Sequence, residues 1–146
     1  FRSGTLPVPL IVGFGEACHI SRSEMEDESR RISDMRNQLQ TRLTSCIYDV
    51  SVNGSMDQRL PGNLNITFNS VNAESLIMAL PEIAFSTGSA CTSTSIAPSY
   101  VLKAIGLSDQ QAYSSVRFGV GKFNTTVEIE YTIDRITETV NRIRKL

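Results

Sequence analysis

Two long amphipathic segments, one toward each end of the chain, constrain the fold more than any other feature of the sequence. From about Leu10 to Ile47 the pattern is helical, and apolar residues recur there at steps of three and four: Ile32, Met35, Leu39 and Leu43. The last segment repeats the pattern with Ile129, Ile133, Ile136, Val140 and Ile143. Each segment predicts a long helix that must bury its apolar face against another helix or a sheet.

Four short segments between the two predicted long helices have the alternation of apolar and polar residues that is typical of strands. They are "YDVSVNGS", which turns at Asn53-Gly54, then "LPGNLNITFNSV", "IAFST" and "SSVRFGVG". Two further segments, "AESLIMALP" and "PSYVLKAIG", predict short helices, with Gly106 as the C-cap of the second. We therefore expect an α+β fold in one domain over residues 1–146, with a short antiparallel or mixed sheet and two long helices packed on one face.

Composition excludes several classes of function. The 146 residues are 40% hydrophobic and 20% charged, with a formal net charge of −1, so the chain is globular and has no basic surface for nucleic acid. No apolar run approaches the roughly 20 residues that span a bilayer. The charges of the first helix, Glu24, Glu28, Arg31 and Arg36, are expected largely off its apolar stripe. The start at Phe1 favours a piece of a longer protein.

The three cysteines, Cys18, Cys46 and Cys91, differ in their surroundings. Their odd number and the lack of CxxC spacing argue against a disulfide framework and a zinc site. Cys18 and Cys46 lie on or near the helical stripe, where a free cysteine behaves as a small hydrophobe. Cys91 lies in "STGSACTSTS", among small hydroxyl residues, with no Lys, Arg or His within ten residues to depress its pKa. The residues alone leave it open whether Cys91 is incidental or reactive.

Three other residues need an interpretation, and for Arg117 two are open. Arg117 is expected on the strand face opposite Val116 and Phe118, either as a solvated arginine or as an anion-binding one. Thr5, beside Gly4, reads as a turn residue. His19 is expected to be a partly exposed helix residue.

Five blocks, in order, carry a resemblance to a known family. They are Arg2–Pro7, Glu74–Leu80, Thr87–Ser93, Pro98–Leu107 and Ser114–Phe123. Together they resemble the C-terminal part of the cysteine desulfurases of the housekeeping iron–sulfur assembly type, which are class-V aminotransferase-like. The resemblance implies the small domain of a fold-type-I enzyme that uses pyridoxal 5′-phosphate (PLP).

The same resemblance implies roles for three residues. Cys91 would be the catalytic nucleophile, taking sulfur from L-cysteine to leave L-alanine and an enzyme persulfide. Arg117 would bind the substrate carboxylate. Thr5 would contact the PLP phosphate of the neighbouring subunit, which implies a homodimer.

The resemblance also implies what this chain lacks. The family holds its PLP lysine in a Ser-His-Lys context, and neither Lys103, Lys122 nor Lys145 has it. The lysine is therefore expected upstream, in an N-terminal domain, and the chain alone is expected to be inactive. The implied partners are an iron–sulfur scaffold and other sulfur acceptors, with tRNA thiolation as a further destination of the sulfur, and with no membrane and no direct nucleic-acid contact. The implied compartment is the bacterial cytoplasm, or alternatively the mitochondrial matrix.

Two other functions stay open at this point. A related PLP enzyme, a selenocysteine lyase, would use the same cysteine segment. A stand-alone persulfide carrier or interaction module would accept sulfur without PLP.

Overall fold

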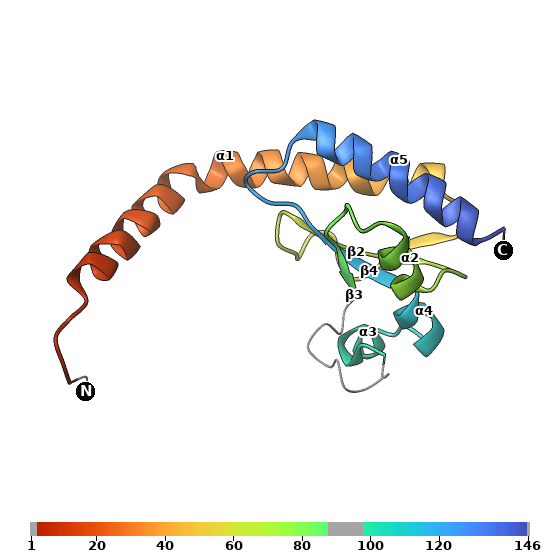
Figure 1. Cartoon of the computed structure of the whole chain (residues 1–146), viewed down its shortest axis with the longest axis horizontal. Helices are drawn as coiled ribbons and strands as arrows, with labels where there is room; N and C mark the ends of the chain where they lie inside the picture. The colour runs from red at the N-terminus through yellow and green to blue at the C-terminus, as the bar shows by residue number, and fades with distance from the viewer. Residues whose placement is uncertain (1–2, 88–97, 146) are drawn as a thin grey trace.

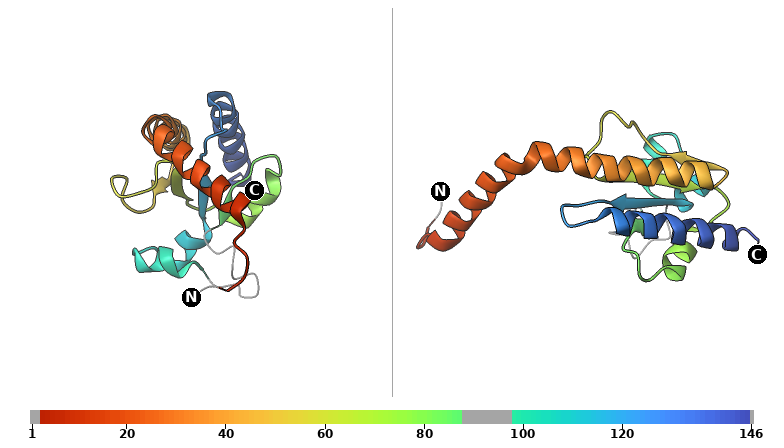
Figure 2. Two further views of the ribbon diagram at one scale, coloured as in Figure 1. Left: turned by 90° about the vertical axis from the view of Figure 1, so that its left-hand side faces the viewer. Right: turned by 90° about the horizontal axis from the view of Figure 1, so that it is seen from above.

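The computed structural model describes residues 3–87 and 98–145. Two long helices, α1 (Val8–Cys46) and α5 (Thr126–Ile143), lie side by side along one face of a sheet (Figure 1; Figure 2). Pro7 and Pro9 stand at the start of α1, where missing amide donors cost nothing. Thr125 caps α5, and the Glu128 carboxylate accepts the Thr125 amide in return, a capping box. Both predicted long helices are confirmed.

The sheet has four antiparallel strands in the order β1-β2-β4-β3. Their bounds are β1 (Val50–Val52), β2 (Asn63–Phe68), β3 (Ser86–Thr87) and β4 (Ser115–Gly119). The central pair places Leu64 opposite Phe118 and Ile66 opposite Val116. These side chains face α1 and α5 and form the core with Met35, Leu39, Leu43, Phe68, Ile129, Ile133, Ile136 and Val140. The predicted α+β architecture is confirmed.

Three short helices complete the described chain. Helix α2 (Ala73–Ala79) is capped by Asn72, whose side chain accepts the Ser75 amide. Helices α3 (Tyr100–Ala104) and α4 (Asp109–Tyr113) lie below the sheet in Figure 1, on the side away from α1 and α5. Gly106 ends α3 with a φ of 99°, as predicted from its position. Helix α4 was not predicted, although Ser108 and Gln111 form a capping box at its start.

The two halves of α1 differ sharply. From Met35 onward the helix packs against the sheet and α5, whereas residues 8–27 are exposed and project away from the sheet (Figure 2). Phe14, for example, keeps 73% of its surface exposed. His19 lies on this projecting half and is exposed, as expected.

Two expectations about α1 are wrong. Cys18 and Cys46 are both exposed and do not pack as small hydrophobes. Cys18 lies on the projecting half, where no described residue covers it, and Cys46 ends the helix on its exposed side. Arg36 is not a solvated charge either, since it is only 7% exposed. It follows Ile32 by four residues and precedes Leu39 by three, so the helical period places it beside the apolar stripe.

Candidate functional site

The face of the sheet opposite the core is polar because strand side chains alternate. On β4, Val116 and Phe118 are buried in the core, and the exposed Arg117 between them points to the other face. Its register partners are Asn65 on β2 and Ser86 on β3. Directly opposed residues of antiparallel strands share a face and lie about 5 Å apart at Cβ. Arg117 is therefore flanked on both sides by short polar side chains.

An open pocket of about 240 Å³ lies in front of Arg117. Its polar wall is Arg117 with three amides from the strand side, and its apolar wall comes from α3. The lining is Asn53, Asn63, Asn65, Ser99, Val101, Leu102, Ile105 and Arg117. Arg117 forms no hydrogen bond or ion pair with any residue in the described ranges. An unpaired guanidinium in such a pocket suits a small carboxylate ligand with a short apolar part.

A buried cluster of hydrogen bonds fixes the floor of this pocket. The Asn53 amide nitrogen donates to Oδ1 of Asn65 at 2.7 Å and to Oγ1 of Thr67 at 2.9 Å. Thr67 lies 2.8 Å from the Ser115 hydroxyl, which donates to the Gln111 carbonyl of α4 at 2.6 Å. Asn65, the register partner of Arg117, is thus oriented by a chain of contacts that reaches α4. The sequence analysis missed this cluster, although the polar alternation Asn63-Asn65-Thr67 indicates the polar face.

The segment with Cys91 lies outside the described residues. The chain enters it from β3, whose last residue, Thr87, is paired with Val116 beside Arg117. It returns at Pro98 and Ser99, and Ser99 lines the pocket. Both ends of the segment therefore lie close to Arg117, since Thr87 follows its register partner Ser86 and Ser99 lines the same pocket.

Thr5 is not brought near Arg117 within this chain. It is exposed and precedes α1, at the far end of the projecting half of the helix (Figure 1). Its hydroxyl has no partner among the residues described, so it is available to a phosphate.

The lysines do not fit the role of a PLP Schiff base. Lys103 pairs with Asp109 at 2.7 Å and Lys122 with Glu24, while Lys145 is exposed after α5. The hydrogen bond that Lys122 donates to the Glu24 carboxylate raises the pKa of Lys122, the opposite of what a nucleophilic amine needs. None of the three lines the Arg117 pocket. Arg117 is suited to bind a carboxylate and Thr5 to contact a phosphate. No lysine of the described residues is placed to form the Schiff base with PLP.

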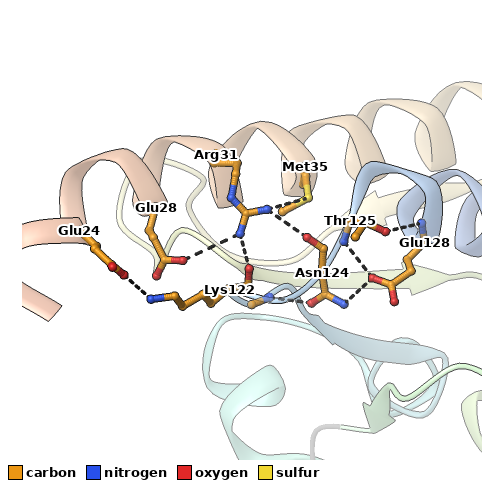
Figure 3. Close-up of polar contacts among 9 residues, drawn as sticks. Glu24, Glu28, Arg31, Met35, Lys122, Asn124, Thr125 and Glu128 are labelled. Atoms are coloured by element: carbon orange, nitrogen blue, oxygen red, sulfur yellow. Dashed lines mark hydrogen bonds and ion pairs between the residues drawn. The ribbon is translucent and has the colours of Figure 1, made fainter. Parts of the chain in front are cut away.

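A second polar network ties the connection between β4 and α5 to α1 (Figure 3). Arg31 donates to the carbonyl of Asn124 at 3.0 Å and to that of Lys122. Asn124 accepts the Gly121 amide at 2.8 Å and lies beside Glu128. This network fixes the end of β4 that leads away from the pocket, and it carries no group suited to catalysis.

The described part of the chain offers neither a membrane-spanning helix nor a metal site. Over the described ranges, no helix is both long and apolar enough to cross a membrane. In the same part of the chain, His, Cys, Asp and Glu side chains do not gather into a group that could hold a metal ion.

Known structures share this α+β arrangement. A solved NifS-like protein matches 96% of this chain with a TM-score of 0.79 at 26% identity, and the match takes up 35% of that protein. The NifS-like protein of Rickettsia africae matches 99% of the chain with a TM-score of 0.78 at 26% identity, over 37% of its own length. The fold is thus that of a part of the NifS-like enzymes.

Sequence comparison gives the family. The aminotransferase class-V model matches residues 1–132, so the chain belongs to that family. Over 145 residues, 99% of the chain, it is 51% identical to the cysteine desulfurase IscS of Salmonella arizonae. That match covers 36% of the relative, so the chain spans about a third of the length of the curated relatives it matches.

Proposed function

We propose that this chain is the part of a cysteine desulfurase that binds the carboxylate of L-cysteine and accepts its sulfur. One observation carries the proposal: the strand leading to Cys91 is paired with β4 at Arg117, beside a pocket whose guanidinium has no partner among the described residues. The 51% identity to a cysteine desulfurase over nearly the whole chain supports it.

In this proposal Arg117 holds the substrate carboxylate with two parallel N–H···O bonds. Asn65, held by Asn53, limits where the bound molecule lies, and the apolar wall of α3 leaves room for its short carbon chain. PLP, when bound, supplies the electron sink that makes the carbon–sulfur bond cleavable.

The sulfur step uses Cys91. Its thiolate attacks the sulfur of the bound cysteine, a sulfur–sulfur bond forms, and the carbon–sulfur bond breaks. The electron pair of the broken bond stays with the three-carbon fragment, which takes up a proton and leaves as L-alanine. Cysteine plus thiol therefore gives alanine plus persulfide, with no outside oxidant.

The wider organisation is part of the same proposal. Residues 1–146 form one domain, and a separate domain of the longer protein provides the Schiff-base lysine. Thr5, exposed before α1, contacts the PLP phosphate of a neighbouring subunit in a homodimer. The persulfide sulfur passes to an iron–sulfur scaffold, with tRNA thiolation as a further destination.

The test uses the full-length protein that contains this chain. Cys91→Ser should still bind PLP but should release no alanine and show no persulfide by mass spectrometry, since only this thiol takes the sulfur. Arg117→Ala should lower kcat/KM for L-cysteine by the equivalent of about 2–5 kcal/mol, because the carboxylate of the bound substrate loses its charged partner.

Arg30→Ala is the matched control, since Arg30 is an exposed arginine on α1 that pairs only with Asp27. Its kcat/KM should stay at the wild-type value. Normal alanine release by Cys91→Ser would contradict the proposal. Turnover of L-selenocysteine in place of L-cysteine would favour the lyase instead.

A further inference from the structure

Arg36 is a buried arginine that has no hydrogen-bond or ion-pair partner in the described part of the chain. It lies on the packed half of α1, between Ile32 and Leu39, and is 7% exposed. Its Nε and Nη1 atoms are buried and form no hydrogen bond. A guanidinium carries five donors and is always charged, so leaving it unpaired in the interior is costly.

A second arginine, Arg59, lies in the connection between β1 and β2, which meets α1 where Gly62 contacts Ile32, one turn before Arg36. Its Nε donates to the Ser55 carbonyl at 2.7 Å and its Nη2 to the Asn53 carbonyl at 2.5 Å. Its Nη1 is buried and has no hydrogen-bond partner among the described residues. Burial lowers the pKa of Arg59 first, and repulsion from Arg36 lowers it further, in agreement with this contact between loop and helix.

No carboxylate of the described ranges neutralises this pair of arginines. The ion pairs found there join other cations: Arg30, Arg31, Arg42, Lys103, Lys122 and Arg135. Every Asp and Glu of the chain lies within those ranges. The two guanidiniums therefore present three buried, unpaired nitrogens with like charge and no counter-ion from the same residues.

We propose that Arg36 and Arg59 form a binding site for one carboxylate group, which accepts hydrogen bonds from the unpaired nitrogens of both. A carboxylate has two oxygens, which three donors can satisfy, whereas a phosphate would bring four oxygens to the same three donors. The carboxylate comes either from a small organic acid in solution or from an Asp or Glu of the longer protein. This site is separate from the Arg117 pocket and does not depend on the proposed function.

The site would tie the loop between β1 and β2 to α1. The loop already passes very close to the helix, because a Cβ added at Gly62 would lie 3.0 Å from Cγ2 of Ile32. The same Cβ would lie 1.9 Å from the carbonyl oxygen of Val120, which follows β4. An anion shared by Arg36 of the helix and Arg59 of the loop would hold the two elements together where their charges repel.

The experiment measures thermal unfolding of the full-length protein and of Arg36→Met, which keeps the volume but removes the charge. Arg30→Met, on the exposed part of the same helix, is the control. Both are compared in sodium chloride and in sodium acetate at equal ionic strength. A filled site predicts that Arg36→Met lowers the Tm by about 5 °C or more, with little change for Arg30→Met.

The two sources give different results. With a carboxylate from solution, acetate raises the wild-type Tm and has no effect on Arg36→Met. With a carboxylate from the protein, acetate changes neither, and a crystal structure of the full-length protein shows an Asp or Glu oxygen within hydrogen-bond distance of Arg36.

Two results would overturn the proposal. One is an Arg36→Met variant as stable as the wild type or more so, as expected when an unpaired buried charge is replaced by an apolar side chain. The other is a crystal structure with no carboxylate at either guanidinium together with no effect of acetate on the wild type. The second result needs no variant, so it decides the matter even if Arg36→Met fails to fold.

Discussion

The two faces of the sheet are made by the same strands but do different work. The face toward α1 and α5 carries Leu64, Ile66, Phe68, Val116 and Phe118, all of them buried. The other face carries Asn65, Thr67 and Arg117. Asn65 and Thr67 accept hydrogen bonds from Asn53, and Arg117 lines the open pocket. The comparison teaches that stability and chemistry are separated by one step along each strand. Substitutions on the two faces should therefore differ in kind.

The largest effect on stability is expected from the core face. Phe68 is fully buried, so Phe68→Ala should lower the free energy of unfolding of the domain by about 3–5 kcal/mol through lost burial and the cavity left behind. Denaturant unfolding of the full-length protein measures the loss. Arg117→Ala is the control from the other face, and its unfolding should change by no more than about 0.5 kcal/mol. Equal losses for both variants would break the comparison.

A smaller effect is expected from the buried cluster behind the pocket. Thr67→Val keeps the shape but leaves Asn53 and Ser115 short of a partner, so we expect a loss of about 1–3 kcal/mol. Because Asn53 also holds Asn65, the variant should raise the KM for L-cysteine as well. Steady-state kinetics beside denaturant unfolding separates the two effects. A loss of stability with an unchanged KM would show that the cluster does not orient the pocket.

A third prediction concerns pH and the start of α5, which covers the core face. The Thr125 amide, hydrogen-bonded to the carboxylate, lowers the pKa of Glu128 below its ordinary value of 4.5. The carboxylate therefore contributes stability above that ordinary pKa, and the contribution is lost as pH falls through the folded-state pKa. The stability difference between wild type and Glu128→Gln should be largest near pH 7 and shrink toward zero in acid. A Glu128 effect that stays constant across pH would contradict the assignment.

The smallest effect is expected outside both faces. Cys18 and Cys46 are exposed, so Cys18→Ala and Cys46→Ala should each change stability by less than about 0.5 kcal/mol. Both thiols should react readily with iodoacetamide in the folded protein, as followed by mass spectrometry. Slow alkylation of Cys18 in the full-length protein would show that another part of it covers the projecting half of α1.

The sequence was sufficient for the architecture because periodicity reports burial directly. The residues that face the core can be read from the apolar stripes of α1 and α5 and from the alternation along β2 and β4. It was not sufficient for Arg36, because a charged residue beside an apolar stripe is more often exposed, and only the packed structure shows it buried. Nor did it show the cluster of Asn53, Thr67 and Ser115, which meet only through strand register. The five-residue α4 is too short for periodicity to reveal.

The site was predictable to a different degree. The alternation of β4 placed Arg117 on the face away from Val116 and Phe118, and the structure confirms that placement. Its role and those of Cys91 and Thr5 came from resemblance and stay predictions. The pocket itself combines α3 with β2, β4 and the residue after β1, and no single stretch of sequence encodes such a surface.

The alternation along β4 also limits how this domain can change over evolutionary time. Substitutions can adjust either face alone, because neighbouring side chains point to opposite sides. An insertion or deletion of one residue would exchange the faces, turning Arg117 into the core and Phe118 into the pocket. We therefore expect lineages of this domain to vary in length at the connections between strands, and to keep β2 and β4 at constant length even where their residues have diverged.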